Sequence, residues 1–137
     1  MSVHFSSEKM DWATPDELFD RLNRVYLFDL DVAANITNAR CERYFDEVTD
    51  GLAQSWLNGR VWCNPPYGRA LGKWVEKANQ EAADATLIVM LVPARTDTKW
   101  WHDAIRHARV EFLKGRLKFK GANASAPFPS ALLYWNC

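Results

Sequence analysis

Residues 86–92 read T-L-I-V-M-L-V, a run that is apolar or β-branched at every position. Such a run predicts a strand that is buried on both faces, as in parallel sheets covered by helices on both sides. Further strands are expected at residues 27–32, 60–63, 110–113 and 131–135, and helices at about residues 14–26, 70–84 and 97–108. Strands that alternate with helices predict an α/β fold with a mostly parallel sheet. No long helix separates the last two strands, so we expect them to pair antiparallel.

Local signals refine some of these elements and leave others open. In T-P-D-E we expect Thr14 to be the N-cap of the first helix, with Pro15 at its first position and Glu17 completing a capping box. The predicted apolar stripe of this helix uses positions 18, 19, 22, 25 and 26. Residues 40–45 are a candidate short strand, and residues 52–57 a candidate helical turn. The helix at 97–108 is expected to be capped by Thr96 or Asp97 and to turn positions 100, 101, 104 and 105 inward.

Length and composition indicate one packed domain spanning residues 1–137. The longest apolar run is too short to cross a bilayer, and the N-terminus M-S-V-H-F-S-S-E does not resemble a signal peptide. The 3 cysteines form no CxxC pair, which favours a reduced, cytoplasmic protein without disulfides or a metal site.

Charge is distributed unevenly along the chain, although the net charge is +0. Residues 1–50 contain 5 Lys or Arg and 11 Asp or Glu, whereas residues 95–121 contain 8 and 3. A basic block of this kind suits a polyanionic partner. A solvated surface is the alternative interpretation of the same block.

The stretch V-W-C-N-P-P-Y-G at residues 61–68 is the strongest candidate for a functional site. Proline cannot donate to a sheet, so Pro65 and Pro66 must end the strand. Asn64 precedes a proline and is therefore pushed toward an extended conformation. Its amide is then held at the carboxyl end of a strand, where open α/β sheets bind their ligands.

Asn64-Pro65-Pro66-Tyr67 resembles the Asn/Asp-Pro-Pro-Tyr signature of S-adenosylmethionine-dependent methyltransferases that act on an amine conjugated to a π-system. Together with L-V-P-A-R-T-D-T-K-W-W and D-V-A-A, it resembles the phage-type DNA N6-adenine methyltransferases along nearly the whole chain. The resemblance implies a compact, Rossmann-like methyltransferase sheet with an antiparallel C-terminal strand and no separate target-recognition domain. It implies that the side-chain oxygen of Asn64 and the carbonyl of Pro65 accept the two amine hydrogens, and that a flipped base stacks on Tyr67.

The resemblance also implies a binding site for S-adenosylmethionine. Thr14 and its neighbours Trp12 and Pro15 would line the methionine end together with Asn64. Asp31 would approach the amino-acid part of the cofactor, in the acid-plus-small-residue loop that includes Ala33. A further residue, Asp50, would accept a hydrogen bond from the cofactor adenine.

Two departures and three alternatives accompany this resemblance. Asn35 stands where the family has a glycine, and the chain has no room for a full second cofactor strand. The same turn chemistry suits the glutamine amide nitrogen of proteins and guanine N2 of RNA, and a third alternative is a non-catalytic DNA-binding module. The basic block favours DNA, with the segment L-K-G-R-L-K-F-K-G expected to form a strand or hairpin with one basic side. The expected DNA contacts are Arg95, Lys114, Arg116, Lys118 and Lys120.

Overall fold

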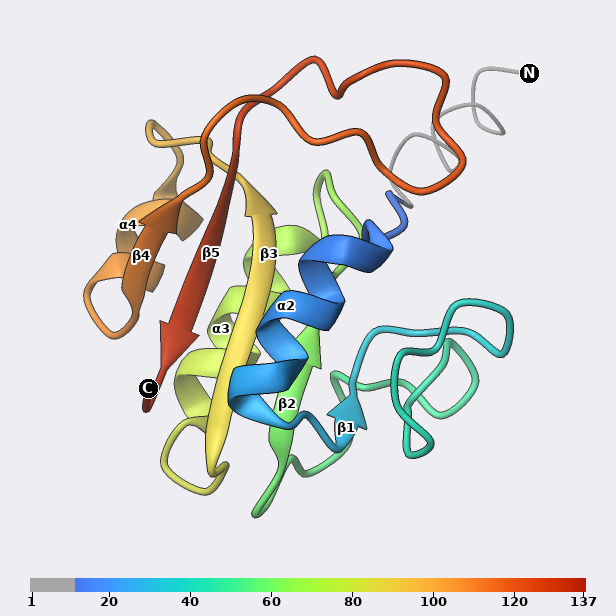
Figure 1. The fold of residues 1–137 in the computed structure, drawn as a ribbon. Coiled ribbons are helices and arrows are strands. Elements are labelled where there is room, and N and C mark those ends of the chain that lie inside the picture. The colour runs from blue at the N-terminus through green and yellow to red at the C-terminus, as the bar shows by residue number, and fades with distance from the viewer. Residues whose placement is uncertain (1–11) are drawn as a thin grey trace.

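The computed structural model describes residues 12–137, which form an α/β domain with one five-stranded sheet (Figure 1). Residues 1–11, on which the expectation of no signal peptide rests, lie outside this range. The helices are α2 (Asp16–Tyr26), α3 (Leu71–Glu81) and α4 (Lys99–Ile105). The strands are β1 (Leu30–Asp31), β2 (Arg60–Cys63), β3 (Leu87–Pro93), β4 (Arg109–Phe112) and β5 (Ser130–Trp135).

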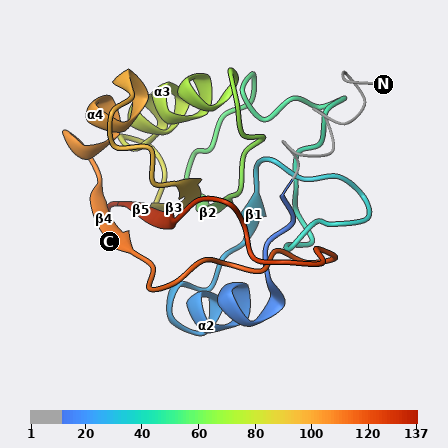
Figure 2. The ribbon, with the colours of Figure 1, turned by 90° about the horizontal axis from the view of Figure 1, so that it is seen from above.

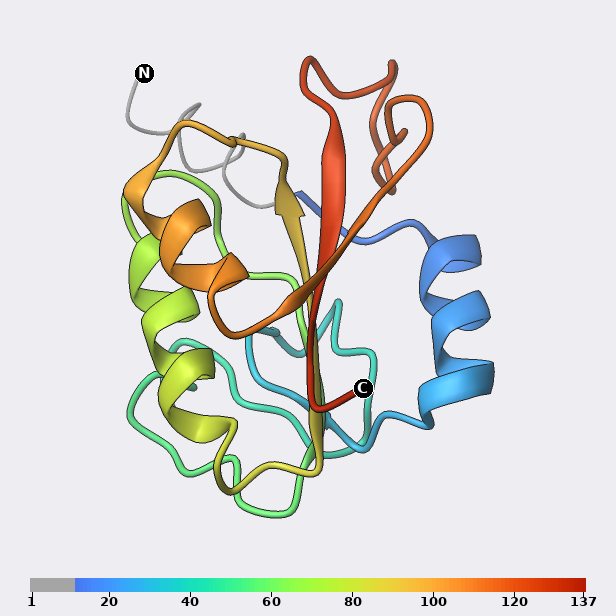
Figure 3. The same ribbon diagram turned by 90° about the vertical axis from the view of Figure 1, so that its left-hand side faces the viewer.

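The sheet is mixed, with the order β1-β2-β3-β5-β4. Strands β1, β2 and β3 are parallel, whereas β5 runs antiparallel to both β3 and β4. Helix α2 covers one face, and α3 and α4 cover the other (Figures 2 and 3). Every residue of β3 and of β5 is buried, as the apolar run at 86–92 predicts. The predicted α/β class, the two helical layers and the antiparallel last strand are confirmed.

The region between α2 and β2 contains less regular structure than predicted. Leu27 is the C-cap of α2 with a φ of 51°, so its backbone cannot be extended, and β1 contains only Leu30–Asp31. The candidate strand at 40–45 is reduced to one parallel bridge, Asp31 to Tyr44. Residues 52–57 form turns rather than a helix. Because β1 contains only two residues, it offers the 40–45 segment too few backbone groups for a longer hydrogen-bonded ladder.

Both predicted helix caps are wrong. Pro15, rather than Thr14, occupies the N-cap position of α2, and no side chain within residues 12–137 caps this helix. The hydroxyl of Thr14 instead accepts a hydrogen bond from Asn64. The cap of α4 is Thr98, whose hydroxyl accepts from the backbone N–H of Trp101.

The predicted apolar stripes also extend too far. Val25 is 67% exposed and Ile105 is 41% exposed, and each lies in the last turn of its helix.

The basic segment L-K-G-R-L-K-F-K-G forms neither a strand nor a hairpin. It opens the 113–129 loop, which joins β4 to β5 and passes over the carboxyl ends of the parallel strands (Figure 1). Its side chains still alternate, since Leu117 and Phe119 turn inward while Arg116, Lys118 and Lys120 are exposed. The alternation was correctly recognised, but it arises from a loop that packs on the domain.

Within residues 12–137, none of the helices has the length and hydropathy needed to cross a bilayer. No three His, Cys, Asp or Glu side chains in that range are grouped to hold a metal ion. Cys41, Cys63 and Cys137 are all free thiols.

Candidate active site

Asn64 follows β2 directly and lies at the carboxyl edge of the sheet, beside the end of β3. Its Nδ2 donates to the carbonyl of Trp12 and, over 3.0 Å, to Oγ1 of Thr14. A backbone carbonyl can only accept, so the amide nitrogen must face Trp12 and the amide oxygen must face the other way. That oxygen, Oδ1, is buried and has no hydrogen-bond partner among the described residues. A buried acceptor left unpaired is unusual in a native protein and marks a position that a ligand donor can occupy.

The rest of the turn is rigid and largely covered. Pro65 is buried and Pro66 is exposed, and the hydroxyl of Tyr67 donates to the carbonyl of Leu91 over 3.3 Å. Burial raises the pKa of Tyr67, so its hydroxyl remains protonated.

The Tyr67 ring is only 5% exposed, because the rings of Phe119 and Phe128 lie against it edge-on, with centroids 6.3 and 5.8 Å away. The ring face on which a flipped base was expected to stack is therefore covered in this structure.

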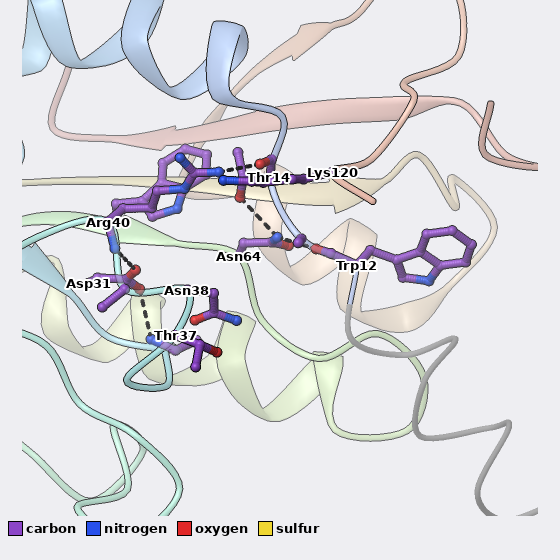
Figure 4. A pocket seen from close by; sticks show the side chains of 12 residues that line it. Trp12, Thr14, Asp31, Thr37, Asn38, Arg40, Asn64 and Lys120 are labelled. Carbon is purple, nitrogen blue, oxygen red and sulfur yellow. Dashed lines mark hydrogen bonds between the residues drawn. The ribbon is translucent and has the colours of Figure 1, made fainter. Parts of the chain in front are cut away.

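A cavity of about 140 Å³ opens beside Asn64 (Figure 4). Arg40, Thr14 and Lys120 border it on one side, and Asp31, Thr37 and Asn38 on the other. The segment of Trp12 and Thr14 reaches it because the chain enters α2 across the carboxyl edge of the sheet (Figure 1). The polar groups of four separate chain segments thus converge on one small space.

Asp31 is the buried acid of this cavity, with only 3% of its surface exposed. Its Oδ1 accepts from the N–H of Ala33 at 3.3 Å, and its Oδ2 from the N–H of Arg40 at 2.9 Å. Burial nevertheless outweighs these bonds and raises the pKa of Asp31 to about 6. A cation beside Asp31 would favour its charged form, so the cavity is suited to an ammonium group.

A second cavity of about 400 Å³ adjoins the first, with Ala33, Asn38 and Asn64 common to both. Its walls are partly apolar and include Val32, Ala34, Phe45, Pro66 and Trp74. Three acids also line it, namely Asp46, Glu47 and Asp50. Together the two cavities form one cleft with a polar end and a partly apolar end.

The position of Asp50 depends on the glycine that follows it. A Cβ at Gly51 would lie 2.0 Å from the carbonyl oxygen of Val32, so only glycine allows this turn to pack on the end of β1. The carbonyl of Gly51 accepts from the indole of Trp56 at 3.0 Å. Asp50 has a φ of 58°, and its Oδ1 accepts from the N–H of Leu52 at 3.1 Å. The turn therefore presents the Asp50 carboxylate to the cleft with little freedom.

Several lining residues were missed from the sequence. Asn35 accepts through Oδ1 from the N–H groups of Thr37 and Asn38, both at 2.9 Å, and so organises the loop that reaches the cleft. An asparagine two residues before a threonine is a signal for such a turn. Asp46 and Glu47 follow the Tyr44 bridge and gave no signal beyond their charge.

The predicted site residues separate into three places. Trp12, Thr14, Asp31, Ala33 and Asn64 line the first cavity, and Asp50 and Pro66 line the second. Pro15 lies outside both, in a groove between α2 and the 113–129 loop that Arg116 and Lys118 also line.

The remaining basic residues are dispersed as well. Lys120 lines the first cavity. The guanidinium of Arg95 lies 5.6 Å from the centre of the Phe128 ring, and Lys114 is exposed and lines neither cavity. The basic block is therefore several sites rather than one surface.

The family model and two relatives that match this chain carry the same description. The family model described as "DNA N-6-adenine-methyltransferase (Dam)" matches residues 2–131. The chain is similar to a DNA N-6-adenine-methyltransferase of Escherichia phage T1, with 37% identity over 99 residues, which cover 71% of this chain and 41% of that protein. It is also similar to a protein of the same name from Haemophilus phage HP1, with 29% identity over 117 residues, 82% of this chain and 68% of that one. The matched part thus spans less than half of the phage T1 relative.

Proposed function

Because the chain belongs to the DNA N-6-adenine-methyltransferase (Dam) family, we propose that it methylates the exocyclic amine of a flipped adenine in DNA, using S-adenosylmethionine. The observation that carries this proposal is the buried Oδ1 of Asn64 at the end of β2, which has no hydrogen-bond partner within residues 12–137. The phage relatives favour action on DNA in the cytoplasm of a bacterial host.

The chemistry needs two fixed acceptors, because the lone pair of an exocyclic amine is delocalised into the ring. In this proposal Asn64 Oδ1 and the carbonyl of Pro65 accept the two amine hydrogens, which draws electron density onto the nitrogen. The bonds from Asn64 to Trp12 and Thr14 hold the amide before the base arrives, so little reorganisation is needed during the reaction. Pro65 and Pro66 restrict the backbone of the turn for the same purpose.

The cleft fits S-adenosylmethionine, which supplies an electrophilic methyl group on a positively charged sulfur when bound. Asp31 is suited to the ammonium of the methionine end, with Trp12 and Thr14 beside it. The second cavity has apolar walls for an adenine ring, and Asp50 for the amine of that ring. Asp46 and Glu47 offer acceptors for ribose hydroxyls. The residues that line the cleft thus include a partner for each end of S-adenosylmethionine.

The test is methyl transfer from labelled S-adenosylmethionine to unmethylated DNA, with digestion of the product to nucleosides. We expect the label in N6-methyladenine, and we expect Asn64→Ala to slow transfer by roughly 10²–10³-fold, as for loss of one preorganised polar group. Asn123→Ala, in an exposed part of the 113–129 loop, is the matched control and should leave the rate unchanged.

Three outcomes would contradict the proposal. Label in the glutamine side chains of an added protein, or in guanine of added RNA, would identify one of the alternative substrates. No transfer of label to DNA, to the added protein or to the added RNA would indicate a non-catalytic module. Full activity of Asn64→Ala on DNA would remove the amine-acceptor role from this turn.

A further inference from the structure

Lys120 belongs to the 113–129 loop by sequence, but its side chain lines the cavity that also contains Asp31 (Figure 4). The loop is fastened there by main-chain and side-chain contacts. The N–H of Lys120 donates to the carbonyl of Ala13 at 3.0 Å, and its Nζ lies 3.3 Å from Oδ1 of Asp16. The Phe119 ring packs against Trp12 with centroids 5.3 Å apart. These contacts hold the loop over the polar end of the cleft.

The two cations of this cavity, Arg40 and Lys120, differ in how many of their N–H donors already make hydrogen bonds. Arg40 donates to Asp16 and to the carbonyl of Thr14, and its guanidinium lies over the Phe19 ring. Lys120 shares the same oxygen of Asp16 over the longer distance, and 60% of its side chain is exposed. An ammonium group has three N–H donors, so Lys120 keeps donors for a further acceptor. It is therefore the cation best able to meet a ligand in this cavity.

The ligand of such a cavity must complement charges of both signs. Asp31 offers a buried carboxylate, and Lys120 offers a positive charge at the border of the same space. An α-amino acid group carries an ammonium and a carboxylate on one carbon and matches this pair. Asp31 can satisfy only the ammonium, which leaves the carboxylate in need of a cation.

We propose that Lys120 binds the carboxylate of the methionine end of the cofactor, so that the 113–129 loop forms part of the cofactor site. This inference rests on the proposed use of S-adenosylmethionine. It assigns Lys120 to the cofactor rather than to DNA, in contrast to the expectation from the sequence. Because Phe119 is adjacent and packs near Tyr67, a ligand that fixes Lys120 also restrains the aromatic cover of the catalytic turn.

The test compares two ligands by calorimetry in the absence of DNA. S-Adenosylhomocysteine contains the amino-acid group, and 5′-methylthioadenosine lacks it. We expect Lys120→Met to weaken binding of S-adenosylhomocysteine by about tenfold, as for one hydrogen bond to a charged group. It should leave binding of 5′-methylthioadenosine unchanged. Methionine keeps the apolar stem of the side chain and removes only its charge.

Lys118→Met is the matched control, since Lys118 lies two residues away in the same loop but lines the groove beside α2. It should alter neither affinity. Unchanged binding of S-adenosylhomocysteine to Lys120→Met would overturn the inference, and so would equal weakening of both ligands, because the effect would then not involve the carboxylate. If the parent protein binds neither ligand, the proposed function itself fails. If it binds both and Lys120→Met behaves as the parent does, only the role of Lys120 fails.

Discussion

At the scale of single residues, two buried polar groups have interactions that residues 12–137 do not complete by themselves. Within that part of the chain Asn64 Oδ1 finds no donor, and the pKa of Asp31 is raised because burial outweighs its two hydrogen bonds. The folded pKa of Asp31 exceeds the ordinary value of 3.8, so the folded state binds more protons than the unfolded state between pH of about 4 and 6. The free energy of unfolding therefore falls as pH rises through this window. Both groups line one cavity, so a ligand that supplies donors and positive charge relieves both.

Ligand binding is expected to depend on the ionisation of Asp31. Below a pH of about 6 its carboxyl is protonated and attracts an ammonium only weakly. We expect the affinity for S-adenosylhomocysteine to increase from pH 5 to 7, with a midpoint near the pKa of about 6, and then to level off. Calorimetry across this range, with 5′-methylthioadenosine as the ligand without an ammonium, measures the effect. An equal pH dependence for both ligands, or one that persists in Asp31→Asn, would assign it to another group.

At the scale of elements, the segments with strong local signals were predicted well. The bounds of β2 were correct, because prolines end the strand at a fixed position, and β3 was displaced by one residue from the run at 86–92. The position of the turn at residues 64–67 followed from these two strands, since parallel neighbours end at the same edge. Residues 113–121, which open the 113–129 loop, were misassigned because their alternation arises from packing against Trp12 and Tyr67, which are distant in sequence.

The region of residues 27–59 was harder to predict for a physical reason. Its conformation is set by single contacts, such as the Asp31–Tyr44 bridge and the bonds of Asn35, rather than by periodic burial. Half of the cleft is built from this region, including Asp46 and Glu47. The position of Asn64 at the edge of the sheet was therefore predictable, whereas most residues that line the second cavity were not.

The turn that presents Asp50 can be tested through Gly51. Its Cβ would lie 2.0 Å from the backbone oxygen of Val32, a contact that no side-chain rotation relieves. We expect Gly51→Ala to lower the free energy of unfolding by roughly 1–3 kcal/mol, as for overpacking, and to weaken binding of 5′-methylthioadenosine by displacing Asp50. Urea denaturation and calorimetry measure the two effects.

Gly72 provides the matched control for this change. It lies within α3, and a Cβ there would meet only the Cβ of Trp100 at an ordinary 3.6 Å. We expect Gly72→Ala to raise the free energy of unfolding by about 0.5–1 kcal/mol, because alanine favours the helix, and to leave nucleoside binding unchanged. If Gly51→Ala proved as stable as the parent, the close approach between the turn and β1 would be wrong.

At the scale of the whole molecule, the sheet separates two helical layers (Figures 2 and 3). A groove with basic residues lies on each side. On the α2 side, Arg21 and Arg24 line a groove with Arg116 and Lys118 of the 113–129 loop, together with two acids, Glu17 and Asp20. On the other side, a groove between α3 and α4 begins at Gly68, directly after the catalytic turn. Its exposed cations include Arg69, Lys73 and Arg106, alongside Glu76 and the Lys99–Asp103 ion pair. Only an experiment that changes each groove separately can locate the DNA.

We expect the DNA backbone to follow the α2 side, where Arg116 and Lys118 are exposed and lie on the loop that covers the catalytic turn. Phosphate contacts release condensed counterions, so each lost contact lowers the slope of log affinity against log salt by about 0.9 for duplex DNA. Arg116→Ala/Lys118→Ala should therefore weaken DNA binding at low salt and flatten this slope by up to about 2, with unchanged affinity for S-adenosylhomocysteine. The control is Lys73→Ala/Arg106→Ala, which removes the same charge from the α3 and α4 layer and should keep the slope of the parent. A flattened slope in the control and a parental slope in Arg116→Ala/Lys118→Ala would place the DNA on the α3 and α4 side instead.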